Sequence, residues 1–274
     1  MFGTVTTIVS DENEDGIALS AALDFARQVN AHLEVICIAI DTAPVEVFGA
    51  VAGGLPAYSL QETHEAAEDL KHWASAMTRD YSRVSVSPLI AAYSGLKHMV
   101  GRLTRFSDIV VAARPMDGSS PSEIVFDALT TAVQQPVLLI SKSPLDLSKL
   151  KRATIAWDES DQALNAVKAS MPLLQKCEQV EVVMIDPKQH SSSRTDPGST
   201  LSSMLARHDI AAEVHLIPQT LPTVAEQILR FSDESGSQMV VMGCYGHSPL
   251  KERLLGGVTR DMIANCDLPM LLNH

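Results

Sequence analysis

The chain has 274 residues and a formal net charge of −12, with 46% hydrophobic residues but only 4% aromatic ones. This length suits one large domain or two ordinary ones, and an aliphatic composition suits buried parallel strands covered by helices. An acidic chain without a basic block lacks the electrostatic footprint of a nucleic-acid-binding protein, so we expect no nucleic-acid partner.

Cysteine usage and hydropathy indicate the compartment. The four cysteines are scattered without a C-x-x-C pair, which favours a reducing cytoplasm over a disulfide framework. The N-terminal stretch "MFGTVTTIVSDENEDG" has neither a basic region nor a long apolar region, as a signal peptide would. No apolar run approaches the roughly 18 residues that cross a bilayer. We therefore expect a soluble, cytoplasmic protein with no membrane contact.

The first half of the chain alternates strand and helix patterns. The apolar run "TIVSDENED" (7–15) ends in Asp-Glu and leads into a helical pattern, and the β-branched run "LEVICIAID" (33–41) follows. An apolar loop, 42–59, comes next. The stretch "SGLKHMVGRLTRFSD" (94–108) carries Lys97, His98, Arg102 and Arg105, and we interpret it as a helix exterior. The runs "SDIVVAARP" (107–115) and "QPVLLI" (135–140) complete the half.

The second half repeats this order. Its matching runs are "TIAWDESDQ" (154–162), "VEVVMID" (180–186), "SQMVVMGCY" (237–245) and "LPMLL" (268–272). Strands that alternate with helices predict parallel sheets with right-handed crossovers. A polar stretch at 141–152 separates the halves. The sequence therefore predicts two α/β domains, 1–145 and 150–274, each with a five-stranded parallel sheet.

Glycines follow the fourth strand of the second half, in "MGCYGHSPLKERLLGGVT" (242–259). Gly243 and Gly246 would let the backbone turn tightly and approach a ligand. Gly256 and Gly257 would open a helix whose free N–H groups and dipole suit an anion, with the Thr259 hydroxyl in its first turn. The spacing G-x2-G-x9-G therefore predicts a phosphate site. The alternative is that these glycines only shape a loop.

Other phosphate motifs are absent from this stretch. It has neither the G-K-[ST] of a P-loop ATPase nor the G-x-G-x-x-G of a Rossmann dehydrogenase. It resembles instead the signature G-x2-G-x9-G-[ST] of the universal stress protein family, in its ATP-binding branch. The resemblance covers the whole chain as a tandem pair, but only the second half carries the motif. It implies that a nucleotide lies across the carboxyl ends of the strands.

The resemblance also implies roles for particular residues. Asp158 matches the acidic residue near the ribose, and Met184 matches the position whose backbone meets adenine. Trp157 either packs in the core or walls the adenine pocket. Gly257 stands where the family has Ser or Thr, so one hydroxyl contact is missing. The residues expected to contact the phosphates are Gly243, Gly246, Gly256, Gly257, Val258 and Thr259.

The first half departs from the motif. Aligning Pro136 with Pro269 places Glu123 and Ile124 against the glycines at 256 and 257, and "ARPMDGSSPSE" lacks the first glycine pair. A carboxylate at this place would repel phosphate. We therefore expect the first half to keep the fold without the site.

The resemblance implies a tandem universal stress protein whose halves pack as a pseudo-dimer, with a further homodimer left open. It would bind an adenine nucleotide, ATP with Mg²⁺ or else ADP or AMP, in a regulatory role toward unknown protein partners. Any hydrolysis would be slow, since no general base or arginine finger is recognisable. Two alternatives stay open: a scaffold of the same fold that binds no nucleotide, and a different ligand in the first half around Phe48 to Tyr58.

Metal and thiol chemistry have weaker signals. The histidines at 190, 208, 215 and 247 show no ligand-pair spacing such as H-x3-H, so we predict surface histidines and no metal site. Cys244 lies inside the glycine-rich stretch, where a small loop residue is the simpler interpretation than a reactive thiol.

Overall fold

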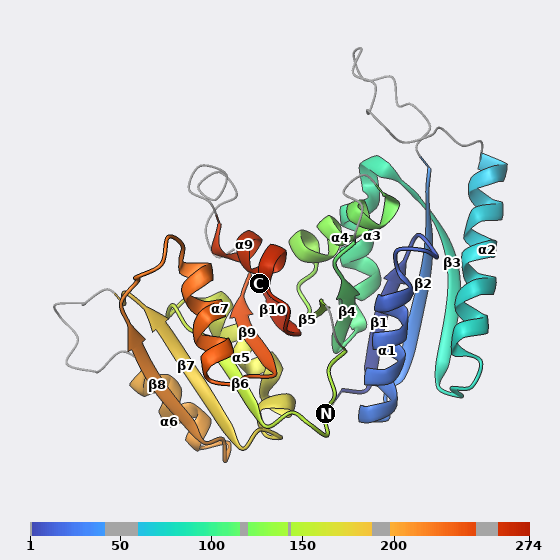
Figure 1. The fold of residues 1–274 in the computed structure, drawn as a ribbon. Helices are drawn as coiled ribbons and strands as arrows, with labels where there is room; N and C mark the ends of the chain where they lie inside the picture. The colour runs from blue at the N-terminus through green and yellow to red at the C-terminus, as the bar shows by residue number, and fades with distance from the viewer. Residues whose placement is uncertain (1, 42–59, 116–119, 142–143, 188–197, 245–256) are drawn as a thin grey trace, which may run out of the picture. The chain divides into compact units, whose positions relative to one another are not determined.

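The computed structural model describes residues 2–41, 60–115, 120–141, 144–187, 198–244 and 257–274. It divides into two compact units, Met1–Ile140 and Ser141–His274 (Figure 1). The division falls at Ser141, the first residue of the polar stretch in which the sequence placed the domain boundary. Each unit is described separately below.

The first unit is a parallel α/β sandwich. Its sheet has the strand order β3-β2-β1-β4-β5, and every described pairing is parallel. Its strands are β1 (Thr4–Val9), β2 (His32–Asp41), β3 (Val84–Ala92), β4 (Ile109–Ala113) and β5 (Val137–Ile140). Its helices are α1 (Gly16–Val29), α2 (Leu60–Thr78), α3 (Leu96–Leu103) and α4 (Pro121–Ala132), with 3-10 turns at Tyr93–Gly95 and Thr104–Phe106 flanking α3.

The second unit repeats this architecture. Its strands are β6 (Arg152–Ala156), β7 (Gln179–Ile185), β8 (Ala212–Ile217), β9 (Met239–Gly243) and β10 (Met270–Asn273). Its described helices are α5 (Asp161–Leu174), α6 (Ser199–Ala206), α7 (Val224–Glu234) and α9 (Val258–Asn265). The order β8-β7-β6-β9-β10 matches that of the first unit. The predicted fold class is confirmed in both halves.

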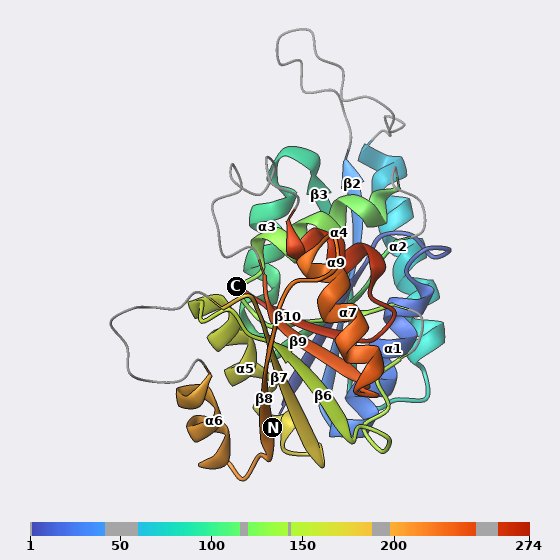
Figure 2. The same ribbon diagram turned by 60° about the vertical axis from the view of Figure 1, so that its left-hand side comes forward.

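Helices cover both faces of each sheet. In the second unit, α7 and α9 lie in front of the sheet and α5 and α6 behind it (Figure 1), and Figure 2 shows the same layers from another side. The first and fourth strands of each unit are neighbours, so the helices that follow them leave toward opposite faces. This arrangement is a topological switch point, where open α/β sheets bind ligands at the carboxyl ends of their strands.

Both cores are aliphatic, as the composition predicts. Every residue of β5 is buried, and so is every residue of β10. Buried hydroxyl pairs join the first and fourth strands in the same way in both units: Thr6 Oγ1 lies 2.6 Å from Ser107 Oγ, and Thr154 Oγ1 lies 2.8 Å from Ser237 Oγ. None of the helices in the described part of the chain is long and apolar enough to span a membrane.

A second repeated contact closes the amino end of each sheet. Asp108 Oδ2 accepts hydrogen bonds from the N–H groups of Gly3 and Thr4, at 2.7 and 2.9 Å. Gln238 Oε1 accepts from the N–H groups of Lys151 and Arg152, at 2.9 and 2.8 Å. The two side chains occupy equivalent places in the repeat, so the halves share detail beyond strand order.

Gly243 ends β9 where the start of α5 presses against it. An ideal Cβ at this residue would lie 2.6 Å from the backbone nitrogen of Ala163 and 2.8 Å from the carbonyl carbon of Gln162. These are backbone atoms at the N-terminus of a helix, so they cannot move aside as a flexible side chain would. Glycine is required here for space, since the residue lies in a strand with extended backbone.

Asp15 fills the corresponding carboxyl edge in the first unit. It is buried, and its Oδ2 accepts hydrogen bonds from the N–H groups of Ser10 and Asp11, at 2.6 and 3.0 Å, and from Ser10 Oγ at 3.3 Å. Burial raises the pKa of this carboxyl, and the hydrogen bonds from Ser10, Asp11 and Ser122 lower it in part. The first unit therefore places its own carboxylate on backbone donors beyond the end of β1.

We expect Gly243→Ala to destabilise the protein by about 1–3 kcal/mol, because the added methyl group overpacks the contact between β9 and α5. Urea-induced unfolding of the full chain would measure this loss. Gly16→Ala is the matched control, since a Cβ there meets no atom within 4 Å. Equal stability of the two variants would contradict the close contact.

We expect the stability of Asp15→Asn, relative to that of the wild type, to increase as the pH rises. The folded-state pKa of Asp15 is raised, so the folded wild type binds the proton more tightly than the unfolded chain does. Its stability therefore falls as the pH rises from the ordinary aspartate value, about 3.9, through the folded pKa. The Asn variant has no such loss, and its amide oxygen can accept the bonds that Oδ2 accepts.

Urea unfolding at about pH 4 and about pH 7.5 brackets this transition. Asp11→Asn is the control. Asp11 lies four residues earlier in the same loop, so this variant reports the effect of removing a negative charge there. A difference between Asp15→Asn and wild type that stays constant with pH would show that burial does not perturb this carboxyl.

Candidate functional site

Three residues of the second unit lie in one row at the carboxyl edge of its sheet. Ala156 of β6 pairs with Val183 of β7 on one side and with Met242 of β9 on the other. The next residue along each strand is Trp157, Met184 or Gly243, and the Trp157 N–H donates to Val183 O at 2.9 Å. The row crosses the switch point between β6 and β9, with Asp158 one residue beyond it.

Asp158 is held at the mouth of this edge by the helix that follows. Its side chain is exposed, and Oδ1 accepts from the N–H of Ser160 at 3.0 Å and from Ser160 Oγ at 2.6 Å. Ser160 in turn caps α5 by accepting from the Ala163 N–H at 3.1 Å. One carboxylate oxygen, Oδ1, thus fixes the turn.

Met184 is buried, and its side chain is committed to the core. Gly198, which precedes α6, has a left-handed backbone with φ +79°, and a Cβ there would lie 2.9 Å from Val214 Cγ1 and 3.4 Å from Met184 Sδ. The start of α6 therefore packs directly over the methionine sulfur. A ligand at this edge would meet the backbone of the β7 end rather than the Met184 side chain.

Two residues next to the row have a left-handed backbone without being glycine. Glu159 has φ 64° and follows Asp158, and Asp186 has φ 42° and follows β7. Such a conformation costs roughly 1–2 kcal/mol for a residue with a side chain, and it gathers at functional sites. The loops after β6 and β7 thus carry local strain on the same edge of the sheet.

The N-terminus of α9 is turned toward this edge, because α9 runs from the loop after β9 back to the start of β10. Gly257 is its N-cap and offers no side chain to the free N–H groups of the first turn. Val258 is half-buried and Thr259 is buried. The predicted residues Gly246 and Gly256 lie outside the described part of the chain. The structure therefore brings together Asp158, Met184 and Gly243 on one edge with α9.

The first unit differs at the equivalent helix. The sequence alignment sets Glu123 against Gly256. In the structure α4 begins at Pro121, so Glu123 lies in the first helical turn. Ser120 is the N-cap: its Oγ accepts from the Glu123 N–H at 3.3 Å, and a proline occupies the first helical position. Burial, followed by the nearby Asp127, raises the pKa of the Glu123 carboxyl.

This edge of the first unit therefore carries acidic groups, Asp15 after β1 and Glu123 at the start of α4, where a phosphate would need positive charge. The alternative ligand region around Phe48 to Tyr58 lies outside the described residues.

A polar network on the other part of the second sheet was missed by sequence reasoning. The prediction that His215 is a surface histidine is wrong, because it is half-buried, donates to or accepts from Glu181 Oε2 through Nε2 at 2.8 Å, and packs against the Phe231 ring at 5.0 Å. Arg152 Nε lies 3.6 Å from the other oxygen of Glu181. His208 is exposed, as expected.

This network has the ligand types of a metal site. Atoms of Glu181, Glu213 and His215 lie within 4.8 Å of one another, and no other such group of three occurs in the described ranges. The Arg152 guanidinium opposes a cation at this place, so we interpret the group as an ion-pair network across β6, β7 and β8. The network joins residues of different strands, which are far apart in the sequence. Its only sequence signal was a glutamate inside the apolar second strand of each half.

The thiols are protected by burial. Burial raises the pKa of Cys37 to about 12 and that of Cys177 to about 11. Cys244 is buried, and its N–H donates to Asn273 O at 2.7 Å. These positions favour packing over thiol chemistry.

Comparison with known proteins extends these observations. The sequence model of the Universal stress protein family matches residues 149–274. A universal stress protein from Archaeoglobus fulgidus DSM 4304 has a TM-score of 0.68 at 13% identity, covering 98% of this chain and 95% of its own. A protein of unknown function from Pseudomonas aeruginosa PAO1 has a TM-score of 0.60 at 13% identity, with coverages of 99% and 92%.

No curated protein sequence matches the chain significantly. At such low identity the solved structures show the fold alone, over both units, whereas the family match rests on the sequence of the second. Residues 149–274 match the universal stress protein family, and the chain has, over 98% of its length, the fold of a solved universal stress protein.

Proposed function

We propose that the second unit binds an adenine nucleotide, ATP with Mg²⁺, and that the protein acts as a regulator rather than as an enzyme. One observation carries the proposal. The strand register sets Met184, Trp157 and Gly243 in a row at the switch point, with Asp158 beside it, inside the residues that match the family.

Each part of a nucleotide has a counterpart at this edge. The carboxylate of Asp158 can accept hydrogen bonds from ribose hydroxyl groups, since only Oδ1 is engaged in the described loop. The backbone at the end of β7 and the half-buried Trp157 border the place for the base. The N–H groups at the start of α9 suit the phosphates, and the N-cap Gly257 has no side chain that could accept from them.

Mg²⁺ would be held by the phosphates and by water, as this ion usually is in nucleotide sites, with few protein ligands. A regulatory role requires the protein to hold the nucleotide and to change the surface that it offers to a partner. We accordingly expect slow hydrolysis. The scaffold alternative keeps the fold and requires no nucleotide, and it is favoured by the glycine at 257 in place of a hydroxyl residue.

We expect about one nucleotide per chain after incubation with Mg-ATP, desalting, denaturation and chromatography of the released nucleotide. Isothermal titration with ATP covers a site that exchanges too fast to survive desalting. A stoichiometry of two would contradict the inference that acidic groups close the first unit. No heat of binding up to millimolar ATP would favour the scaffold.

We expect Asp158→Ala to weaken ATP binding by about 10- to 100-fold, the value of a hydrogen bond to a charged group. Asp11→Ala is a closely matched control. Asp11 Oδ1 accepts from the N–H groups of Asn13 and Glu14, at 2.8 and 3.2 Å, so both variants lose a carboxylate that fixes the loop after a first strand. Equal affinities in the two variants would place the nucleotide elsewhere.

A further inference from the structure

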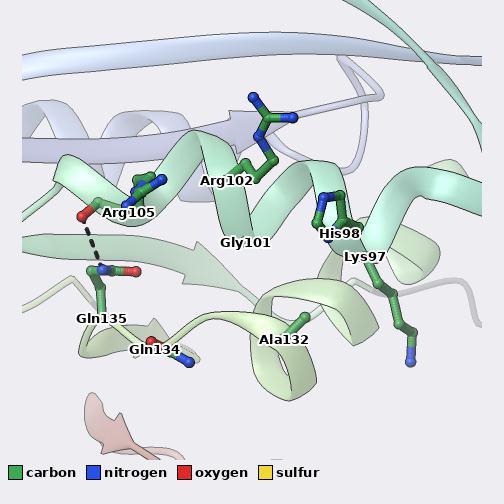
Figure 3. Close-up of a pocket in the computed structure, with 8 residues that line it drawn as sticks. All are labelled: Lys97, His98, Gly101, Arg102, Arg105, Ala132, Gln134 and Gln135. Atoms are coloured by element: carbon green, nitrogen blue, oxygen red, sulfur yellow. Dashed lines mark hydrogen bonds between the residues drawn. The ribbon is translucent and has the colours of Figure 1, made fainter.

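We propose that a pocket of the first unit, between α3 and the end of α4, binds a small phosphorylated polyol such as a sugar phosphate. Its volume is about 410 Å³, which suits a small ligand. The lining includes Lys97, His98, Arg102 and Arg105 from α3 and its 3-10 continuation, and Ala132 and Gln135 from the end of α4 and the residues after it (Figure 3). This proposal is independent of the nucleotide site in the second unit.

The rim of the pocket carries positive charge, and part of it has no carboxylate partner in the described part of the chain. Lys97 Nζ is paired with Asp127 at 2.7 Å and donates to Thr131 Oγ1 at 3.2 Å. Arg102 and Arg105 are exposed, and neither has a carboxylate within 4.0 Å among the described residues. The Arg105 guanidinium instead lies 5.1 Å from the centre of the Phe106 ring.

The whole chain is acidic, with 33 Asp and Glu residues against 21 Lys and Arg. Five other described arginines have a carboxylate within 4.0 Å, whereas Arg83 and Arg207 do not: the five are Arg27, Arg79, Arg152, Arg230 and Arg260. A guanidinium group carries a fork of N–H donors that matches the oxygen atoms of a phosphate group, and two such groups lie three residues apart along this stretch. The rim therefore favours an anion.

The floor of the pocket offers acceptors instead. Gly101 lets α3 approach the end of α4 closely, since a Cβ there would lie 3.0 Å from Ala132 O. Ala132 is the last residue of α4, and the last carbonyl groups of a helix have no partner within it. Ala132 O therefore lies against Gly101 at the floor of the pocket.

Gln135 adds a second acceptor. Its Nε2 donates to Arg105 O at 3.1 Å (Figure 3), which fixes the orientation of the amide. Its Oε1 is then buried without a hydrogen-bond partner, and in the described part of the chain no other side-chain atom is left so. A buried acceptor of this kind costs free energy unless a donor reaches it. The floor therefore favours hydroxyl or N–H groups.

Together these features define the chemical class of the ligand. An anionic group fits the rim, and hydroxyl donors fit the floor. The His98 imidazole is the one ring in the described lining, so a nucleobase would find little surface to stack on, which argues against a nucleotide here. A compact phosphate ester with free hydroxyl groups meets both demands.

The test is isothermal titration of the full chain with glucose 6-phosphate, inorganic phosphate and glucose, each also in the presence of saturating Mg-ATP. We expect saturable binding of glucose 6-phosphate at least about tenfold tighter than that of inorganic phosphate, no response to glucose, and no effect of ATP. Equal affinities for the ester and for phosphate, or no saturable binding up to about 10 mM, would overturn the proposal.

Variants locate the site. We expect the double variant Arg102→Gln/Arg105→Gln to lose at least about tenfold in affinity for both phosphate compounds. Arg79→Gln, at an exposed arginine of the same unit outside the pocket, should bind as wild type does. Unchanged affinity in the double variant would overturn the assignment. These side chains are exposed, and unfolding midpoints check that each variant is folded.

Gln135→Met tests the floor separately. It removes the buried acceptor while leaving the cations, so we expect it to weaken binding of glucose 6-phosphate severalfold and to leave inorganic phosphate unaffected. An equal loss for both compounds would show that Gln135 acts only by shaping the rim, and the hydroxyl part of the proposal would fail.

Discussion

The pairing of β6 with β9 is the constraint on which the second unit depends. It makes the first and fourth strands neighbours, and it forces the start of α5 against the end of β9. Only glycine fits at 243 because backbone atoms of Gln162 and Ala163 occupy the place of a Cβ. The residue that this packing demands also lies on the edge at which we propose that the nucleotide binds. Stability and the proposed site therefore involve the same position.

The two units show how one framework can carry two different edges. The amino ends are closed in the same way, by Asp108 in one unit and by Gln238 in the other. At the carboxyl ends they diverge, since the first unit directs the Asp15 carboxylate onto the N–H groups of Ser10 and Asp11. Backbone donors that are satisfied by an internal carboxylate are not available to an external anion. A fold can thus be retained while a site is closed from within.

Sequence reasoning found what depends on order along the chain. The alternation of apolar runs and helical patterns predicted the order of strands and helices along each half, and the matching runs at 107–115 and 237–245 place Asp108 and Gln238 at equivalent positions of the two units. Sequence reasoning failed where contacts join residues of separate strands. His215 and Glu181 come together only because β7 and β8 pair, and the spacing of these residues in the sequence does not predict their contact.

Local signals explain other misses. The Ser-Pro pair at 120–121 is a local signal for the start of α4, because serine is a common N-cap and proline suits the first helical position. Asp15 is a second acid in the same loop as Asp11, and its burial follows from where the loop turns, which sequence does not give. The predicted roles of Asp158, Met184 and the phosphate-loop glycines remain proposals, and two of those glycines lie outside the described residues.

A chain with a net charge of −12 can hold an anion only where the positive potential is local. In the nucleotide site that we propose, the second unit would hold the anion with backbone N–H groups at the N-terminus of α9, which need no cationic side chain. The first unit offers a device made of side chains, Arg102 and Arg105, which stand in solvent. Exposed charges are screened beyond about 8 Å at physiological salt, whereas backbone donors act at hydrogen-bond distance. The side-chain device therefore needs acceptors such as Gln135 Oε1 beside it to distinguish its ligand from free phosphate, and the floor of the pocket places one there.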